Sequence, residues 1–523
     1  MKIRINQFSA PLDYTLPTLS DQLSRALNLP AEKIQNVTVT RRSVDARSRK
    51  GPVCFTLSVE FEITGAPRSQ VEKKLRKIPS ASLIEAVSKH KPAEDFKLTR
   101  EISSRPVVVG AGPAGLFAAW QLAVAGAKPI LIERGKASRD RAKAVAQFWK
   151  DGTLDAENNV LFGEGGAGLF SDGKLTTRSK LRESLRTVLE LFVATGADSD
   201  ILIDAEPHIG SDKLLQIVPR IRQQIIDLGG EVLFDTALES VEVKQGKLVA
   251  VIAAGKRIET SHCILATGHS ARDIYKMLHR ENVQLAPKPF AIGVRVELPQ
   301  DQINYSQYRE SASHPRLGAA SFRLTRKADD THRSCYSFCM CPGGEVIACA
   351  HSAGELTTNG MSLSSRKQSY GNAAFLVPVE PGDFASAENN PLAGIAFQEE
   401  FERKAFSAGG ENFTLPACMV TDFLEGKISR QLPADRSAKR AQVANLREIL
   451  PAFVTETLDK TLAIMLKKLG KVRIVRDEDF QSPTAAGLYP AGEGAGYAGG
   501  IVTTAIDGLR TARAVIENIN SEK

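Results

Sequence analysis

The chain has 523 residues, enough for about three domains at about 150 residues each. Its hydrophobic fraction of 42% and charged fraction of 24% are those of a globular protein, and no apolar run is long enough to form a membrane span. The seven cysteines form no CxxC pair, which argues against a disulfide framework and against a disulfide reductase. The amino terminus lacks the apolar core of a signal peptide, so we expect a cytoplasmic protein.

The net charge of +8 lies in residues 1–105, which hold 19 basic and 11 acidic residues. The basic side chains concentrate in residues 41–77, a surface suited to nucleic acid or to an acidic protein partner. A solvated face of a small domain is the simpler interpretation, because no RNA-reading aromatic motif or zinc-finger spacing accompanies the charge.

Residues 1–100 are predicted to form a small basic α+β domain. The opening MKIRINQFSA alternates like a strand, and Ser20 is suited to cap a helix that runs through Leu27. NVTVTRRSVDAR and VCFTLSVEFEI are predicted to be two strands joined by a basic turn, followed by a helix from about Ser69. The polar stretch HKPAEDFKLT then serves as a linker.

Next comes the segment RPVVVGAGPAGLFAAWQLAVAGAKPILIERG. It predicts a buried strand over residues 106–109, an apolar helix over 116–125 and a second buried strand over 129–132. Between the first strand and the helix, three glycines follow the GxGxxG spacing. A carboxylate ends the second strand. The cofactor-binding residues that we predict here are Gly110, Gly112, Pro113, Ala114, Gly115, Glu133 and Arg134.

This arrangement is typical of a dinucleotide-binding turn. The first glycine allows the tight turn, the second lets the backbone approach a pyrophosphate, and the third permits close packing of helix and strand. The helix N-terminus offers free N–H groups to the phosphates. Glu133 is placed to accept the ribose hydroxyls. The segment alone does not distinguish FAD from NAD.

Two later segments favour FAD. FGEGGAGLFSDGKLT, residues 162–176, resembles the glycine-doublet loop that packs on the flavin cofactor in the fumarate reductase and glutathione reductase superfamilies. GLYPAGEGAGYAGGIVTTAIDGLRTA, residues 487–512, resembles their carboxy-terminal FAD segment, and HCILATGHSAR has their strand-ATG form. The resemblance implies further cofactor contacts from these segments at Gly165, Gly166, Gly268, Gly492, Glu493, Gly500 and Ile501.

The order of these segments predicts an α/β fold with a discontinuous Rossmann-type FAD-binding domain. Its first part spans residues 105–284 and its closing segment spans 481–523. An inserted α+β substrate domain occupies 285–480. Blocks such as EGGAGLFSDGKLTTR, KPFAIGVRVE and FCMCPGGEV resemble the bacterial and archaeal family of FAD-dependent dehydrogenases of unassigned substrate. That resemblance implies noncovalent FAD and a small-molecule substrate.

The inserted domain and the glycine-doublet loop carry the candidate catalytic residues. TTNGMSLSSR places Asn359 and Arg366 in a polar segment with helical spacing toward Arg366, where they face a substrate or cap a helix. Lys174 is suited to compensate the negative charge of the cofactor. CYSFCMCPGGEVIACAHS carries four cysteines on two predicted strands, with Cys335, Cys339 and Cys341 on one face of the first strand at a period of two. They are interpreted as small core residues, with a single thiol facing the flavin or a metal site as alternatives. No metal site is predicted.

We therefore expect an FAD-dependent dehydrogenase or reductase acting on a small molecule. A flavin monooxygenase is one alternative, and an RNA-associated flavoprotein that uses the basic first domain is another. Only one strand-GxGxxG-helix-strand unit occurs, so NAD(P)H is expected at most as a transient electron donor.

Overall fold

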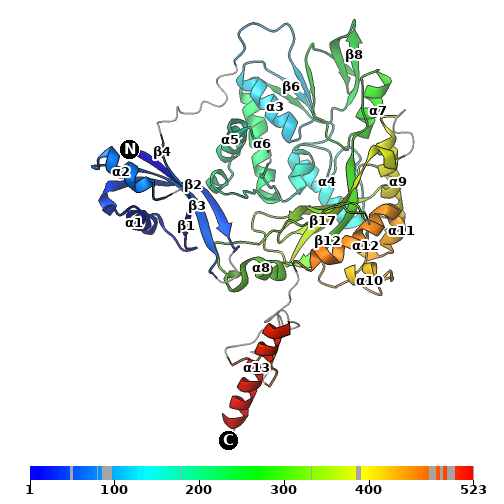
Figure 1. Cartoon of the computed structure of the whole chain (residues 1–523). Coiled ribbons are helices and arrows are strands. Elements are labelled where there is room, and N and C mark those ends of the chain that lie inside the picture. Colours follow the sequence, from blue (N-terminus) through cyan, green and yellow to red (C-terminus); the bar gives the residue numbers. More distant parts are fainter. Residues whose placement is uncertain are drawn as a thin grey trace.

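The computed structural model describes residues 1–47, 51–78, 80–84, 97–177, 179–330, 332–384, 390–469, 479–482, 487–491 and 501–521. Figure 1 shows a small amino-terminal domain at one side of a larger α/β body, with the carboxy-terminal helix α13 extending from that body. No helix among the described residues has the length and apolar character needed to cross a lipid bilayer.

The amino-terminal domain is an antiparallel sheet in the order β2-β3-β1-β4, packed against two helices. Its core contains Ile3, Leu19 and Phe61, all fully buried. The elements are β1 (Lys2–Ala10), α1 (Leu16–Leu27), β2 (Ile34–Asp45), β3 (Cys54–Ile63), α2 (Arg68–Leu75) and β4 (Ala81–Ile84). The expected strands are confirmed.

The predicted start of the first helix was wrong. The helix α1 begins at Leu16, because Thr15 and Thr18 form a reciprocal capping box and Pro17 fits the first turn. Ser20, the predicted cap, lies inside the helix and its hydroxyl donates to the carbonyl oxygen of Leu16.

This domain is joined to the body through β2. The amide of Arg42 donates to the carbonyl oxygen of Ile203 at 2.7 Å, and its guanidinium contacts Asp204 at 2.8 Å and Asp200 at 2.6 Å. Although burial opposes it, these carboxylates raise the pKa of Arg42 above its ordinary value. Arg42 is therefore engaged within the chain, whereas Arg49 and Lys50 lie outside the described residues. A nucleic acid or acidic partner at 41–77 stays a prediction.

The body contains a parallel sheet in the order β11-β5-β6-β7. The predicted strands are confirmed, with β5 entirely buried. The elements around this sheet are β5 (Val107–Val109), α3 (Pro113–Val124), β6 (Ile130–Ile132), α6 (Ser211–Asp227), β7 (Glu231–Leu233) and β11 (Cys263–Leu265). Helix α3 begins three residues before the predicted start, because Pro113 has the fixed φ that a first helical turn requires.

Other elements complete this part of the body. They are α4 (Ser138–Asp151), the short 3-10 turn η2 (Gly166–Phe170), α5 (Arg182–Ala194), the 3-10 turn η3 (Ser199–Leu202), the antiparallel strands β8 (Leu238–Lys244), β9 (Lys247–Ala253) and β10 (Lys256–Glu259), and α7 (Arg272–Arg280). An apolar core that includes Val108, Leu131 and Ile221 lies between the parallel sheet and α3, α4 and α6.

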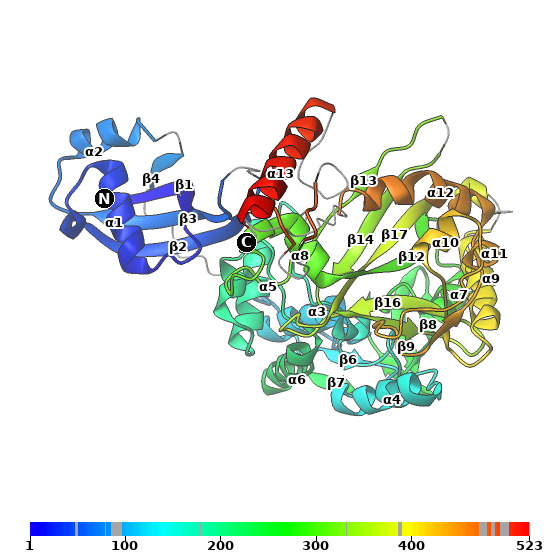
Figure 2. The same ribbon diagram turned by 90° about the horizontal axis from the view of Figure 1, so that it is seen from below.

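The remainder of the body is built on an antiparallel sheet in the order β12-β17-β14-β13. Helix α12 packs on β14 and β17, as Figure 2 shows. The elements are β12 (Phe290–Pro299), α8 (Gln300–Tyr308), β13 (Thr325–Arg326), β14 (Cys335–Cys341), β15 (Glu345–Cys349), β16 (Thr357–Met361), β17 (Tyr370–Val379), α9 (Ala393–Ala408), β18 (Leu415–Ala417), α10 (Val420–Leu424), β19 (Ala441–Val443), α11 (Leu446–Ile449) and α12 (Ala452–Leu466).

Two local predictions in this part were wrong. The segment with helical spacing toward Arg366 is the strand β16, paired with β15, followed by a turn in which Arg366 has a φ of 49°. The alternation of cysteines on β14 is interrupted by a bulge, since Phe338 pairs with Ala374 and Cys341 pairs with Asn372.

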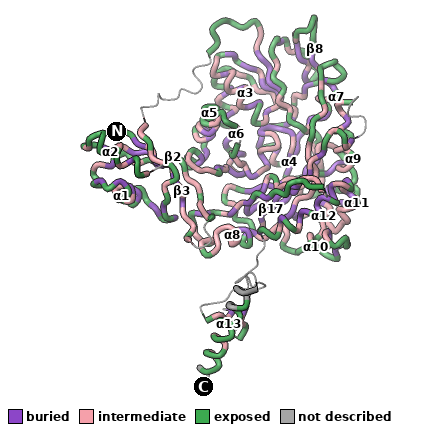
Figure 3. Tube along the Cα trace, viewed as in Figure 1, coloured by how far each residue is buried: buried purple, intermediate pink, exposed green. Residues whose placement is uncertain are grey.

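The carboxy-terminal helix α13 (Ile501–Ser521) starts at the predicted residue. Figures 1 and 3 show it extending from the body with mostly exposed residues. It was predicted to begin against the cofactor, but Leu509, Ile516 and Ile519 are more than half exposed. The predicted contacts Gly492, Glu493 and Gly500 lie outside the described residues.

Candidate functional site

The glycine-rich turn after β5 is shaped by contacts that exclude side chains. Gly110 has a φ of 97°, and a Cβ there would lie 2.5 Å from the carbonyl oxygen of Ala266 on the segment after β11. A Cβ at Gly115 would overlap the carbonyl oxygen of Gly110. These two glycines are therefore required by the protein's own packing.

Gly112 differs from the other two glycines. It has an ordinary φ of −75°, and a Cβ there would meet only the Cα of Gly166, at 3.7 Å. Gly166 in turn has a φ of 59°, and its own Cβ would lie 3.0 Å from the Cα of Gly112. The amide of Gly165 donates to the carbonyl oxygen of Ala111 at 2.8 Å. The glycine doublet thus faces the glycine-rich turn, backbone against backbone.

Glu133 at the end of β6 joins three backbone segments. Its carboxylate accepts from the amides of Ala111 at 2.7 Å, Gly135 at 3.0 Å and Gly163 at 3.0 Å. The side chain is buried but lies on the wall of a cavity. Because a carboxylate offers about four lone-pair positions, it can still accept from one ligand hydroxyl.

The loop 159–166 is held by a buried arginine that the sequence reasoning missed. Arg141 on α4 donates to the carbonyl oxygens of Asn159, Val160 and Glu164, each at 2.8 Å. It is fully buried and also contacts Gly166. The signal was present in the sequence, because Arg141 shares a helical face with Val145 and Phe148, both of which are buried.

These segments surround a cavity of about 420 Å³ at the carboxyl ends of β5, β6 and β11. Ligands of open parallel sheets bind at such an edge. Arg134 stacks over the ring of Phe162 at 4.7 Å on the cavity wall. The predicted cofactor residues that line the cavity are Gly110, Gly112, Pro113, Ala114, Glu133, Arg134, Gly166 and Gly268. No described residue of α13 lines it.

A second cavity of about 510 Å³ adjoins the first. The two share Leu161, His269 and Ser270 as wall residues. Most of the second cavity's wall comes from the predicted substrate domain, with apolar side chains from β12, α9 and the segment 415–423. An apolar cavity with a few polar groups is typical of a small-molecule site.

One side of this second cavity carries an ion-pair network. Arg272 contacts Glu355 at 3.2 Å and Glu402 at 2.7 Å, and His351 contacts Glu355 at 2.8 Å. Burial, together with Arg272, lowers the pKa of His351 to about 4. The His and the two carboxylates have metal-ligand geometry, but Arg272 already supplies a positive charge to both carboxylates. We assign no metal there.

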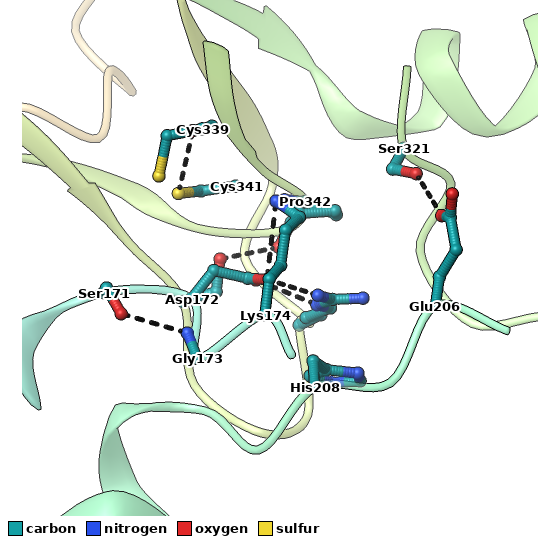
Figure 4. A network of polar contacts seen from close by, with 12 residues as sticks. Ser171, Asp172, Gly173, Lys174, Glu206, His208, Ser321, Cys339, Cys341 and Pro342 are labelled. Carbon is teal, nitrogen blue, oxygen red and sulfur yellow. Dashed lines mark hydrogen bonds and ion pairs between the residues drawn. The ribbon is translucent and has the colours of Figure 1, made fainter. Parts of the chain in front are cut away.

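The loop after η2 carries a second network, shown in Figure 4. Asp172 is buried and accepts two hydrogen bonds from Arg366, one of them at 2.9 Å. Lys174 Nζ lies 3.5 Å from Asp172 and makes no hydrogen bond to a described residue. Although burial would raise it, the two cations hold the pKa of Asp172 below its usual value. His208, whose pKa is lowered by burial and by Arg366, lies beside them.

The structure thus brings two of the three catalytic candidates together. Arg366 and Lys174 share Asp172, whereas Asn359 on β16 accepts from Arg295 at 3.4 Å and from the amide of Gly360 at 2.8 Å. None of the three lines either cavity described above. Their catalytic role stays a prediction.

The cysteines of residues 335–349 separate into two kinds. Cys335 and Cys349 are buried, and burial raises the pKa of both thiols. This agrees with their interpretation as small core residues. Cys339 and Cys341 lie side by side at the bulge of β14, in an arrangement that alternation along a regular strand does not predict. Among the described residues, no group of cysteines has metal-ligand geometry.

Comparison with known proteins identifies two matched regions. Residues 289–474 match a family model described as "FAD-dependent protein, C-terminal domain-like". Residues 2–62 match a model described as a domain of unknown function.

Two relatives and one solved structure illustrate the similarity. An uncharacterized protein of Clostridium beijerinckii is 40% identical over 544 aligned positions that cover 100% of both chains. A thiamine thiazole synthase of Aeropyrum pernix is 26% identical over 203 residues, 36% of this chain and 63% of that protein. The glycerol-3-phosphate dehydrogenase of Bacillus halodurans, solved with FAD, is 12% identical with a TM-score of 0.26, over 55% of this chain and 49% of that one.

Proposed function

Because the chain belongs to a family of FAD-dependent proteins whose substrates are unassigned, we propose that it is an oxidoreductase that binds FAD noncovalently in the cavity beside Gly112 and Glu133. The observation that carries the proposal is the approach of Gly112 and Gly166, which leaves backbone alone at the start of α3. Such a bare helix N-terminus suits a pyrophosphate, because its free N–H groups and positive dipole end favour an anion.

The other walls of the cavity fit the remaining parts of the cofactor. Glu133 is held by three amides in one orientation, in which it can accept a ribose hydroxyl. Arg134 and Phe162 form a stacked pair suited to flank an adenine ring. Bound FAD would supply hydride and electron chemistry, and the protein supplies orientation and substrate choice.

We place the small-molecule substrate in the adjoining cavity of about 510 Å³. Its shared wall with the first cavity at His269 and Ser270 supports this placement. Its apolar walls and the charged group at Arg272 favour a largely apolar molecule with one polar end.

The test is the substitution Gly112→Val. The structure leaves room for a side chain beside Gly166, so the variant is expected to fold and to lose FAD, since the added methyl groups occupy the space of the phosphates. FAD content is read from the flavin absorbance of the purified protein. Gly382→Val is the control, because Gly382 has no heavy atom within 4 Å of its Cβ position and lies far from the cavity in sequence. A folded Gly112→Val variant with full FAD would contradict the proposal.

The presence of a single dinucleotide-binding unit bears on whether a pyridine nucleotide donates the electrons. We expect NADH or NADPH to bind weakly, so that flavin reduction in stopped-flow mixing does not saturate at low micromolar concentration. The rate at which oxygen reoxidises the reduced flavin would separate this function from the monooxygenase alternative.

A further inference from the structure

Cys339 and Cys341 lie at the bulge that interrupts the pairing of β14 with β17. In a regular strand their side chains would be separated by about 6.6 Å along the chain, from a rise of about 3.3 Å per residue. The bulge adds one residue, and Cys339 takes a left-handed φ of 43°. This local bend places the two thiols close enough to influence each other's protonation, and Figure 4 shows the two sulfur atoms side by side.

The two thiols are not equivalent. Cys341 is fully buried, and its thiol also lies 3.3 Å from the carbonyl oxygen of Cys339. Cys339 is partly exposed, so a small molecule can reach it first. This is the arrangement of a pair in which one thiol attacks and the other resolves.

The charges around the pair favour a thiolate on Cys339. Arg295 on β12 donates to the carbonyl oxygen of Cys339 at 3.1 Å, and Lys174 lies nearby with Nζ free of hydrogen bonds to described residues. The acid facing the pair, Asp172, is paired with Arg366. The hydrogen bond from Cys341, with Arg295 and Lys174, lowers the pKa of Cys339 to about 6 against the effect of burial. The pKa of Cys341 is raised by the same hydrogen bond and by burial.

Although the absence of a CxxC pair argued against a disulfide reductase, the bulge of β14 brings Cys339 and Cys341 together. We propose that these two residues form a redox-active dithiol that reduces small-molecule disulfides. The thiolate of Cys339 attacks one sulfur of the disulfide, forming a mixed disulfide and releasing one thiolate. Cys341 loses its proton and attacks the sulfur of Cys339, forming the Cys339–Cys341 disulfide and releasing the second thiolate. The dithiol loses two electrons and two protons, and the small molecule becomes two thiols. Excess thiol reverses both steps. This chemistry does not rest on bound FAD.

The other cysteines provide internal comparisons. Cys335 and Cys349 are buried core residues with raised pKa values, so they are expected to stay reduced. Cys54 in the amino-terminal domain is partly exposed and has no second cysteine on its strand, so it is expected to stop at a mixed disulfide.

The test exposes the full-length protein, reduced and freed of reductant, to oxidised glutathione. Peptide mass spectrometry without reduction is expected to find the segment with Cys339 and Cys341 lacking a pair of hydrogen atoms. In Cys341→Ser the reaction is expected to stop with glutathione on Cys339, whereas Cys339→Ser is expected to react at neither position. Cys54→Ser is the matched control and should behave as the natural chain at the pair.

Two results would overturn the proposal. One is a natural chain that keeps both thiols while Cys54 is modified, and this result needs no variant to fold. The other is a folded Cys339→Ser variant in which Cys341 reacts with glutathione as fast as Cys339 does in Cys341→Ser.

Discussion

The guanidinium of Arg141 donates to the carbonyl oxygen of Gly166 at 2.8 Å. The residue that holds the glycine doublet in place is therefore a buried arginine on α4, outside the motif itself. Burial lowers the pKa of Arg141 to about 9, opposed by Glu133 and Glu164, so the side chain is charged at neutral pH. Its donors bind the carbonyl oxygens of Asn159, Val160 and Glu164, which accept from no backbone amide of the described chain.

Arg141→Met is expected to destabilise the protein by about 3 kcal/mol or more, because each buried carbonyl left without a partner costs about 1–3 kcal/mol. The variant should also lose FAD, since the loop that faces Gly112 is no longer held. Chemical denaturation and flavin absorbance measure the two effects. Arg139→Met on the exposed side of the same helix is the control. Unchanged stability in Arg141→Met would show that the loop holds its shape without it.

Substitutions of Gly112 and Gly115 in the turn are expected to differ in their effects. Gly115→Ala should prevent folding or destabilise the chain severely, because its Cβ overlaps the carbonyl oxygen of Gly110. Gly112→Ala should fold normally, with a Cβ at ordinary contact distance from Gly166, and lose only FAD affinity. Thermal melting of the two variants with and without added FAD distinguishes these outcomes. Equal melting temperatures would contradict the division into packing and cofactor glycines.

Much of the nucleotide-binding fold could be predicted from local sequence. The buried strand β5, the glycine spacing and Glu133 are adjacent in the chain, and each has a physical requirement that few residue types meet. The facing of Gly112 and Gly166 agrees with the resemblance on which the doublet was identified.

The rest depended on contacts between distant segments. Asp172 and Arg366 are 194 positions apart, and neither residue's neighbours indicate the other. The helical spacing toward Arg366 was misleading, because pairing of β16 with β15 overrides local propensity. The bulge at Cys339 adds one residue to β14, and a period of two cannot reveal an added residue.

The amino-terminal domain is expected to be dispensable for FAD binding. The residues that line the cofactor cavity fall between Val109 and Tyr275, none of them in the first hundred. A chain that starts at Glu101 should therefore bind FAD. Removal of the first domain also uncovers Leu317, which packs in the core of that domain. The substitution Arg42→Ala in the full chain weakens the attachment without truncation and should leave FAD content unchanged. Soluble protein without FAD in either case would place part of the cofactor site in the first domain.

His351 is expected to make stability depend on pH. Its pKa is about 4 in the folded protein and 6.5 as the ordinary value, so the unfolded chain binds a proton where the folded one does not. The contribution to stability is present above pH 6.5 and is lost as the pH falls from about 6.5 to about 4. His351→Gln should flatten this part of the stability curve, and His279→Gln, at an exposed position, should not. Denaturation midpoints across the pH range measure the effect, and a parallel curve for His351→Gln would contradict it.

The last prediction concerns the edge strand β11 and helix α13. Ile264 on β11 is 39% exposed, which is unusual for a parallel sheet. Leu509 and Ile516, seven residues or about two turns apart on α13, are 63% and 56% exposed. Both apolar surfaces belong to one chain, and covering each large aliphatic side chain contributes about 1.5–3 kcal/mol. We therefore expect FAD binding to bring α13 against the β11 edge, as the order of the sequence segments predicts.

Hydrogen exchange measured with and without FAD tests this closure. Amides of residues 501–521 should exchange more slowly when FAD is bound, because a packed helix opens less often than an exposed one. Leu509→Glu places a charge in the new contact and should abolish the slowing and weaken FAD binding. Arg513→Glu changes the charge at another exposed position of the same helix and serves as the control. Equal exchange of α13 in the two states, with FAD bound to the protein, would show that the helix does not close the site.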